Sequence, residues 1–330
     1  MKKRATAQEV AQLAGVSKWT VIRAFTPGAS ITEVSRAKVM AAAEQMNYRP
    51  NLLARSLATR STRQVAVFVD DFANPYKLQL IEATTAALQA EGLVALLVNI
   101  NEHLDHVHAI LNADQRQVDA VVLLGTSFRE ETLADSRLRD GGPPLFVLAR
   151  DSQLAGIPAV SCDSAVAMEE ICRHLAARGF RRPGFMSGPR TLSTALGRHR
   201  HFRDHWASRS IEVAELQASP YSHAAGATAM RAYLAANPPG ARIDVLVCEN
   251  DILAHGALDV LRHEAGLSVP SDMAVVGFDD AAPSALPGYD LTTYRQPVGR
   301  MVETLVDMLS GRRPHDTIVL RGELVLRSSA

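Results

Sequence analysis

Long hydrophobic runs are absent from this chain of 330 residues. Its longest apolar stretches, such as Val121–Leu124, have the length of a buried strand and fall far short of the roughly 20 residues that a membrane-spanning helix needs. The basic start, Met1–Arg4, is followed by polar residues and not by the apolar core of an export signal. The sequence therefore predicts a cytoplasmic protein with no membrane partner.

Cysteine is scarce, and the three cysteines are odd in number and widely spaced: Cys162, Cys172 and Cys248. This pattern predicts neither a disulfide framework nor a metal site, and buried free thiols are the expected state. A histidine-rich stretch at 103–108 has no cysteine or distant third ligand to accompany it, which favours a solvated helix surface over a bound metal.

Familiar catalytic motifs are also missing. The chain contains no Walker loop, no G-x-G-x-x-G after its first strand and no H-E-x-x-H. It has no G-x-S-x-G elbow either. We therefore expect neither an enzyme nor a bound cofactor. A cytoplasmic α/β enzyme with an accessory DNA-binding head stays open as an alternative, and turnover of a bound sugar would favour it.

The formal net charge of zero hides an asymmetry along the chain. Residues 1–60 contain ten Lys and Arg against three Asp and Glu, a balance of +7. The remaining residues contain 25 against 32, a balance of −7. A small basic head on an acidic body predicts that the head, and not the body, contacts a polyanion.

Residues 6–48 carry the signals of three short helices. The capping-box spacing of Thr6–Glu9 favours the first, and an apolar stripe follows it, made of Val10, Leu13 and Ala14. Gly15–Ser17 can end this helix and cap the next, which is expected to run to about Phe25. The third helix begins near Thr32. Helix, tight turn and helix are the plan of a helix-turn-helix.

The outer face of the second helix is the candidate DNA reader. The N-terminal part of this helix enters the major groove in such motifs. Lys18 and Arg23 can donate to guanine, and Trp19 can make apolar contact with a thymine methyl group. The alternatives are a solvated face for the two cations and packing of Trp19 on the third helix.

The head resembles the lactose-repressor (LacI/GalR) family in Val10–Lys18, Thr20–Val21 and Asn47–Asn51. The resemblance implies base-reading positions for Lys18, Trp19 and Arg23. The full set of DNA contacts expected in the head is Thr6, Ser17, Lys18, Trp19, Thr20 and Arg23. Ile22 and Thr26 depart from the family, which usually has Ser and Asn there, so these two contacts cannot be carried over.

A short hinge follows the head. Asn51 can cap a helix of barely two turns through Arg55 and Leu57, too short to be stable in water by itself. The resemblance implies paired hinge helices from a dimer in the minor groove, with Leu57 as a wedge between base pairs. Asn51, Arg55 and Leu57 are therefore predicted DNA contacts. An ordinary linker helix with Leu57 packed on the body is the alternative.

The body alternates apolar strands with helical stretches, which predicts parallel sheets buried on both faces. The expected strands are Val65–Val69, Leu93–Val98, Ala120–Leu124, Leu145–Leu148, Pro183–Met186, Val245–Cys248 and Met273–Val276. The expected helices include Leu78–Glu91, Ala165–Arg178, Gly226–Ala235 and Leu253–Glu264.

The family resemblance extends over the body in Asn74–Tyr76, Val118–Asp119, Asn250–Asp251, Val276–Asp280 and Leu291–Thr293. It implies an α/β chain with a small all-α head and a two-lobed, type I periplasmic-binding-protein-like effector domain. The predicted domains are a head at 1–50, a hinge and linker at 51–63, and an effector and dimerisation domain at 64–330. Lobe 1 is expected at about 64–160 plus 293–325, and lobe 2 at about 161–292.

Polar residues that follow the strands are candidates for an effector cleft, since open parallel sheets bind ligands at the carboxyl ends of their strands. They are Tyr76, Lys77, Asp151, Thr194, Arg198, Tyr221, Asn250 and Asp279. Carboxylates, an arginine fork and an aromatic face suit a polyhydroxylated ligand. If Lys77 and Arg198 both face the cleft, an anionic effector such as a sugar acid becomes a hypothesis.

Simpler roles remain open for four of these residues. Asp279 and Asn250 can instead cap the structure that follows them, and Tyr221 can be a surface aromatic. Part of the basic cluster that begins at Arg198 must face solvent.

The predicted function is that of a ligand-responsive transcriptional regulator, a repressor of a sugar, polyol or sugar-acid operon. Its predicted partners are double-stranded operator DNA, a small-molecule effector and a second copy of the chain, with a tetramer as the alternative. A sugar receptor of the transport type is the second candidate, disfavoured by the basic head and the polar start of the chain. Whether the effector releases or promotes DNA binding is left open.

Overall fold

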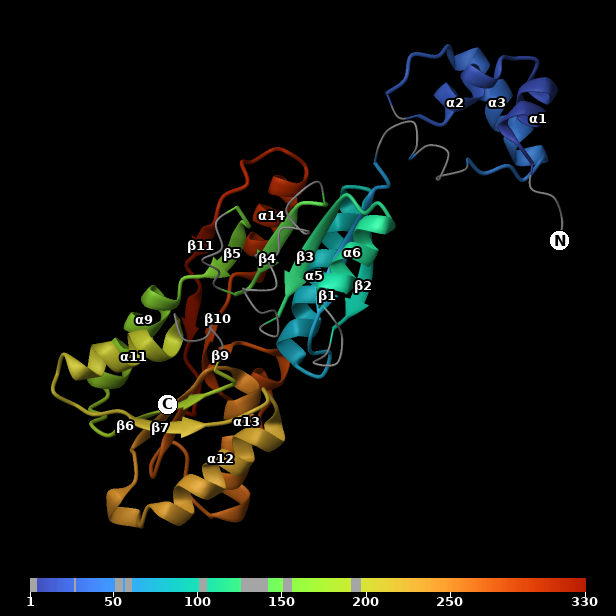
Figure 1. Cartoon of the computed structure of the whole chain (residues 1–330). Coiled ribbons are helices and arrows are strands. Elements are labelled where there is room, and N and C mark those ends of the chain that lie inside the picture. Colours follow the sequence, from blue (N-terminus) through green and yellow to red (C-terminus); the bar gives the residue numbers. More distant parts are fainter. Residues whose placement is uncertain are drawn as a thin grey trace. The chain divides into compact units, whose positions relative to one another are not determined.

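The computed structural model describes residues 5–26, 28–50, 56, 61–100, 106–125, 142–150, 156–190 and 197–330. The chain forms two compact units, Met1–Thr62 and Arg63–Ala330. Figure 1 shows a small helical unit and a larger unit built of sheets and helices. In the described ranges, every helix is too short or too polar to cross a bilayer.

The small unit contains three helices around a compact core: α1 (Ala7–Ala14), α2 (Lys18–Ala24) and α3 (Glu33–Gln45). Val10, Val21 and Val39, one from each helix, are fully buried in that core. The capping box of Thr6 and Glu9 forms as predicted, and Gly15 ends α1 in the left-handed conformation at φ 66°.

Several apolar residues of the small unit lie outside its core. Leu13, expected in the inward stripe of α1, is 49% exposed. Val34 and Met40 of α3 are also exposed. Three short helices enclose too little volume to bury every apolar position, and the small side chains of Ala11, Ala42 and Ala43 fill the close contacts instead.

The large unit is built on two sheets of six strands each. Sheet A has the order β11-β5-β4-β3-β1-β2, and its paired strands are all parallel. Its strands are β1 (Gln64–Val69), β2 (Val94–Asn99), β3 (Ala120–Leu124), β4 (Leu145–Leu148), β5 (Ala159–Cys162) and β11 (Ile318–Leu320).

Sheet B has the order β12-β10-β9-β8-β6-β7, and β12 is its antiparallel edge. Its strands are β6 (Pro183–Ser187), β7 (Ala214–Gln217), β8 (Val245–Cys248), β9 (Ala274–Asp279), β10 (Thr292–Arg295) and β12 (Glu323–Val325). The central strands β8 and β9 are buried along their whole length, as a strand covered on both faces must be.

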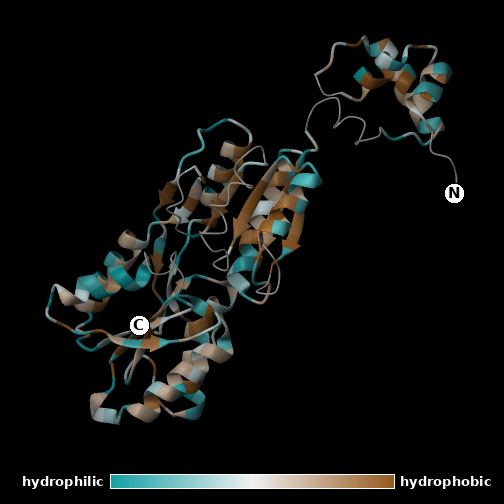
Figure 2. Ribbon diagram, in the orientation of Figure 1, coloured by the Kyte–Doolittle hydropathy of each residue, from teal (hydrophilic) through white to brown (hydrophobic). Residues whose placement is uncertain are grey.

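Helices cover both faces of each sheet (Figures 1 and 2). On sheet A, one core cluster includes residues of α5 (Pro75–Ala90) and α14 (Val298–Leu309), and the opposite cluster includes α6 (His106–Gln115). On sheet B, α9 (Ser164–Ala177) and α11 (Arg198–Ala207) contribute to one cluster. The other contains α12 (His223–Ala236) and α13 (Asp251–Asp259), which a π-helical turn, Val260–Glu264, extends. Short 3-10 turns lie at Pro239–Ala241 and Ala282–Ala285.

The chain passes between the two sheets after β5, after β10 and after β11. The sequence placed all of 293–325 in lobe 1, together with sheet A. The structure differs at both ends of this range, because β10 and β12 pair with each other in sheet B. Strands this short, with mixed polar residues, give no clear hydrophobic signal. The α/β, parallel, two-sheet fold class is confirmed.

Candidate functional site

Helix α2 presents its first turn to solvent. The Ser17 side chain accepts from the Thr20 amide at 3.1 Å, and the two hydroxyl oxygens lie 2.9 Å apart. This cap fixes the start of the helix, so that the residues after it project outward. Lys18 and Arg23 are exposed, and the Trp19 side chain is 72% exposed. Packing of Trp19 on the third helix is therefore excluded.

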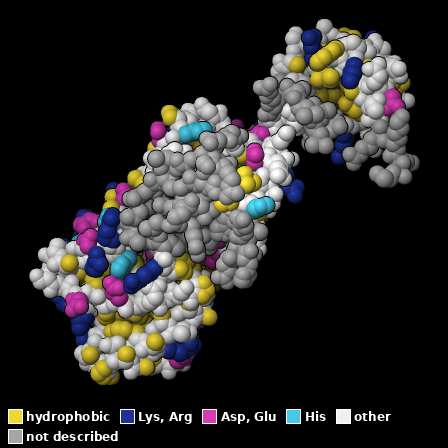
Figure 3. All heavy atoms as spheres, viewed as in Figure 1, with side chains coloured by type: hydrophobic (Ala, Val, Ile, Leu, Met, Phe, Trp, Pro, Cys, Tyr) yellow, Lys and Arg dark blue, Asp and Glu magenta, His cyan; other side chains and the backbone are white. Residues whose placement is uncertain are grey.

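A cation and apolar groups share this surface. Ile22 is 41% exposed on the same helix as Trp19. Figure 3 shows hydrophobic and Lys or Arg side chains next to one another on the small unit. The apolar indole ring of Trp19 is exposed to water, and its burial against a binding partner would be favourable. This face of the small unit is therefore suited to binding.

Helix α3 holds α2 at its C-terminal end. The Arg36 guanidinium donates to the Ala24 carbonyl at 2.7 Å. The Thr26 hydroxyl donates back to the Ile22 carbonyl at 2.9 Å. These contacts satisfy carbonyl groups that the helix end leaves open. The predicted hinge contacts Asn51, Arg55 and Leu57 lie outside the described residues.

The large unit contains a polar cleft at the carboxyl ends of its strands. Its lining residues are Asn74, Tyr76, Lys77, Ala149, Arg150, Ser161, Cys162, Ser164, Gly197, Arg198, Tyr221, Glu249, Asn250, Asp279 and Gln296. Six predicted residues are thus brought together: Tyr76, Lys77, Arg198, Tyr221, Asn250 and Asp279. Asp151 and Thr194 lie outside the described residues. Both sheets contribute, as expected of a cleft between lobes.

Arg198 is held from several sides at the start of α11. Its guanidinium lies over the Phe278 ring, 3.5 Å from the centroid, and Nη1 donates to the Glu249 carbonyl at 2.5 Å. Burial by itself would lower the pKa of Arg198, but the nearby carboxylates of Asp279 and Glu249 raise it. The guanidinium is therefore a fixed cation whose remaining N–H groups can donate to a ligand.

Asp279 ends β9 and accepts from Gln296 Nε2 at 2.7 Å. It lines the cleft, and the side chain does not cap the 3-10 turn that follows, so the capping alternative fails. Burial raises its pKa to about 8, although Arg198 lowers it in part. The Gln296 Oε1 atom and the Tyr76 hydroxyl are buried without a hydrogen-bond partner among the described residues. Polar groups of this kind favour a polar ligand.

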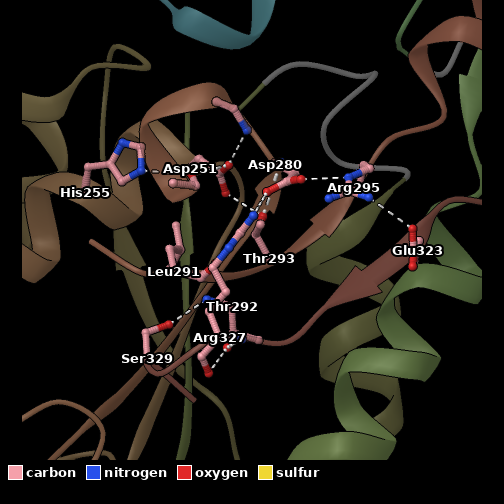
Figure 4. Close-up of polar contacts among 12 residues, drawn as sticks. Asp251, His255, Asp280, Leu291, Thr292, Thr293, Arg295, Glu323, Arg327 and Ser329 are labelled. Atoms are coloured by element: carbon pink, nitrogen blue, oxygen red, sulfur yellow. Dashed lines mark hydrogen bonds and ion pairs between the residues drawn. The ribbon is translucent and has the colours of Figure 1, made fainter. Parts of the chain in front are cut away.

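The corner that presents Asp279 has an unusual backbone. Asp279 and Asp280 both have positive φ, 120° and 54°. Non-glycine residues in that region cost about 1–3 kcal/mol each and persist only where their surroundings hold them. The Asp280 carboxylate accepts from Arg295 Nε and from Arg327 Nη2, both at 2.7 Å (Figure 4).

Asp251 holds the same corner from the other side. This buried carboxylate accepts from the Ala281 amide at 2.7 Å, the Ser284 hydroxyl at 2.7 Å and the Thr293 hydroxyl at 2.6 Å. Its neighbour Asn250 caps α13 by accepting from the Leu253 amide at 3.3 Å and also lines the cleft. The capping and cleft roles that the sequence left open for Asn250 are therefore compatible.

Tyr221 forms an aromatic wall of the cleft and is not a surface aromatic. Its hydroxyl donates to the Glu249 carboxylate, which also accepts from the Gly188 amide at 2.5 Å. Burial raises the pKa of Glu249, and the Gly188 amide and Arg198 lower it in part. Gly188 lies directly against the ring, since a Cβ atom there would be 2.0 Å from Tyr221 Cε1.

Gly188→Ala is expected to weaken effector binding about 10-fold, because the added methyl group must displace the Tyr221 ring from the cleft wall. Titration calorimetry with the effector measures this loss. Gly240→Ala is the matched control, since a Cβ atom at Gly240 meets nothing within 4 Å. Equal affinities of the two variants would show that Tyr221 does not contact the ligand.

The thermal stability of the ligand-free protein is expected to fall as pH rises from 6.5 to 8. Folded Asp279 keeps its proton up to about pH 8, whereas the unfolded chain has released it at its ordinary pKa of 3.8. Each pH step in that interval therefore favours unfolding, by at most about 1.4 kcal/mol per unit. The window lies above the pKa of Asp251, about 6, and of His255, about 4. Scanning calorimetry of Asp279→Asn should show a flatter dependence of Tm on pH.

Lys77 lines the cleft from the helix α5, which packs on sheet A. Its ammonium group pairs with the Asp70 carboxylate, which is almost fully buried. The residue lies in the first turn of α5, after the Asn74 cap. Lys77 is therefore a partly neutralised cation that still faces the cleft.

Sequence reasoning missed nine of the lining residues: Asn74, Ala149, Arg150, Ser161, Cys162, Ser164, Gly197, Glu249 and Gln296. Ala149 and Arg150 directly follow β4, so the strand-end rule that selected Asp151 should have selected Arg150 as well. Glu249 precedes a recognised Asn-Asp pair, and nothing in its own spacing indicated the cleft. Gln296 comes after β10, a strand that was not predicted.

The three cysteines are free and buried, as predicted. Burial raises the pKa of the Cys162 thiol in the cleft to about 12. It also raises the pKa of Cys172 and Cys248 well above their ordinary value. All three therefore remain thiols at neutral pH and are poor nucleophiles.

Comparison with known proteins assigns the two units. Residues 6–51 match the family of "bacterial regulatory proteins, lacI family", and residues 172–330 match the "periplasmic binding protein-like domain". The transcriptional regulator CelR of Thermobifida fusca is 28% identical over 345 residues, 99% of each chain. The chain thus joins a lacI-type DNA-binding domain to a periplasmic-binding-protein-like domain, and the relatives that match its whole length are transcriptional regulators. It is a DNA-binding, ligand-responsive transcriptional regulator.

Further relatives and solved structures match over nearly the whole length. The transcriptional repressor PurR of Yersinia enterocolitica is 29% identical over 335 residues, 98% of this chain and 96% of the relative. The lac repressor dimer bound to operator and the anti-inducer ONPF superposes with a TM-score of 0.85 at 23% identity, over 99% of each chain, which shows the shared fold. The CelR–cellobiose complex gives a TM-score of 0.70 at 26% identity, over 99% of this chain and 100% of the other.

Proposed function

We propose that the chain is a homodimeric repressor of sugar-related genes whose cleft binds a sugar, polyol or sugar acid and thereby changes operator affinity. The observation that carries this proposal is the cleft itself. Side chains from both sheets meet there as fixed donors, acceptors and an aromatic wall. CelR, a relative over the full length, is known in complex with cellobiose.

The DNA contacts are assigned to the head and hinge. Lys18, Trp19 and Arg23 choose the bases, and Ser17 and Thr20 fix the helix that carries them. Thr6 at the start of α1 supplies a backbone contact. Asn51, Arg55 and Leu57 are proposed for the hinge from the sequence alone.

An exposed apolar edge supports a dimer. The edge strand β2 exposes Val94 by 57% and Leu97 by 49%, and Leu78 of the neighbouring helix α5 is 49% exposed. An unpaired edge strand with apolar residues favours association with another copy. The lac repressor, which shares the fold, is a dimer on its operator. Two heads then bind two half-sites of an inverted repeat.

The crossover segments that join the two sheets contribute to the cleft. Gln296 lies in the crossover after β10, and Ser164 begins α9 just after the crossover from β5. A ligand that contacts both lobes and these segments binds more tightly to one relative orientation of the lobes than to another. Its differential affinity for the two states sets how far operator binding shifts.

No catalytic step is part of this proposal. The relatives named above are regulators, and the cysteine among the described cleft residues, Cys162, is a poor nucleophile. No cofactor is invoked. A DNA-binding regulator acts where the chromosome is, so we infer a cytoplasmic location.

Leu57→Ala tests the hinge assignment. Loss of an apolar wedge is expected to weaken operator affinity about 10-fold and to leave effector affinity unchanged. Electrophoretic mobility shift with a selected operator duplex, together with calorimetry of the effector, measures both quantities. Equal losses in the two assays would show that Leu57 supports the fold instead of the DNA contact.

A further inference from the structure

The two ends of the proposed effector cleft differ in charge. At the sheet A end, the described residues bring the cations Lys77 and Arg150 together with one carboxylate, Asp70. At the sheet B end, Arg198 faces the two carboxylates of Glu249 and Asp279. A ligand that fits this cleft is therefore itself polarised along its length.

The sheet A end is a compact cationic cluster at three neighbouring strands, β1, β3 and β4. Asp70 follows β1 and packs against Gly125 after β3, where a Cβ atom would be 2.2 Å from the carboxylate carbon. Lys77 pairs with Asp70, and Arg150 after β4 donates to the Gly125 carbonyl at 2.9 Å. Ala149, between β4 and Arg150, adds only a methyl group to the lining.

One helix N-terminus adds to the positive potential of the sheet A end. The helix α5, 16 residues long, begins at the cleft with Asn74, Tyr76 and Lys77 among the lining residues. N-terminal helix ends favour anions through their amide groups and dipole. The Tyr76 hydroxyl, in a residue only 5% exposed, has no partner among the described residues, and the charges that act on it are those of Asp279 and Arg198.

The sheet B end is suited to hydroxyl groups and not to an anion. Arg198 already donates to the Glu249 carbonyl and lies over Phe278. Asp279 lines this end as a carboxyl group, and the Gln296 Oε1 atom is an acceptor that has no donor among the described residues. The sequence suggested an anionic group for Lys77 and Arg198 together, and the structure favours Lys77 and Arg150 as its partners.

We propose that the effector is a polyhydroxylated carboxylate, a sugar acid, whose carboxylate contacts Arg150 and Lys77 while its hydroxyl groups face Tyr76, Asp279 and Gln296. This inference rests on the proposed function and names the ligand class for the same cleft. Charge-assisted hydrogen bonds to arginine and lysine supply the discrimination.

Calorimetry with matched pairs tests the proposal on the full-length protein. The pairs are D-gluconate and D-glucitol, D-glucuronate and D-glucose, and D-galacturonate and D-galactose. The best acid is expected to bind at least about 10-fold more tightly than its neutral partner. Arg150→Met should reduce the affinity for that acid about 10-fold more than it reduces the affinity for the neutral partner. Arg190→Met, an exposed arginine paired with Glu215, is the control.

The outcomes separate this inference from the function beneath it. Neutral members that bind as tightly as the acids, or equal losses of both in Arg150→Met, would overturn the sugar-acid assignment alone. An acid that binds but leaves operator affinity unchanged would overturn the proposed function, while the ligand class would stand. Failure of every pair to bind would contradict both.

Discussion

Arg198→Ala is expected to lower effector affinity by at least about 100-fold and to leave operator affinity in the absence of effector unchanged. The guanidinium lines the cleft, donates to the Glu249 carbonyl and lies over the Phe278 ring. Its loss removes a hydrogen-bond donor for the ligand and leaves Glu249 and Phe278 without these contacts. Loss of one partner from a desolvated, hydrogen-bonded charge pair costs about 2–5 kcal/mol. Calorimetry and operator mobility shift on the same preparation measure the two quantities.

Two variants control this result. Arg198→Lys keeps the cation but removes the planar fork, so an intermediate affinity is expected. Arg190→Ala removes an exposed arginine outside the cleft and should bind effector normally. If Arg198→Ala lost operator binding and effector binding to the same degree, the assignment of effector binding to the large unit and DNA binding to the small unit would be wrong.

Trp19→Ala is expected to weaken specific operator binding by about 10- to 100-fold while non-specific DNA binding changes little. The indole is 72% exposed in the described structure, so its removal takes little from the core of the head. Contacts to base edges contribute about 1–3 kcal/mol of discrimination, whereas non-specific affinity comes from phosphate contacts. Fluorescence anisotropy with operator and scrambled duplexes, at two salt concentrations, measures both affinities.

Met40→Ala is the matched control for Trp19, because it shortens another apolar side chain of the same unit, 47% exposed on α3. It should bind operator normally. A Trp19→Ala protein that loses operator and scrambled duplex equally, or one that matches Met40→Ala, would remove Trp19 from the base-reading set.

The elements with strong local signals could be predicted from the sequence. Capping at Thr6, Ser17 and Asn250 involves neighbours three residues away, and each cap forms as the spacing indicated. The long buried strands were also found, because β-branched runs between helices have few other interpretations. These elements suffice to give the fold class.

Features that depend on distant neighbours could not be predicted. The short strands β11 and β12 are defined by pairing with β5 and β10, far away in the chain. Glu249 enters the cleft because Gly188 and Tyr221 meet it there, and Arg150 does so beside Gly125. Leu13 is exposed because a core of three short helices fills with smaller side chains. The hydrophobic periodicity of a sequence does not predict contacts of this kind, because they depend on the tertiary structure.

Operator affinity measured with and without effector, on one full-length preparation, tests the central claim most directly. Selection from random duplexes supplies the operator, and the best ligand of the matched sugar and sugar-acid pairs supplies the effector. The account predicts that saturating effector changes operator affinity about 5- to 150-fold, and that Arg198→Ala abolishes the change. Tight binding of that ligand with an unchanged operator affinity would contradict it.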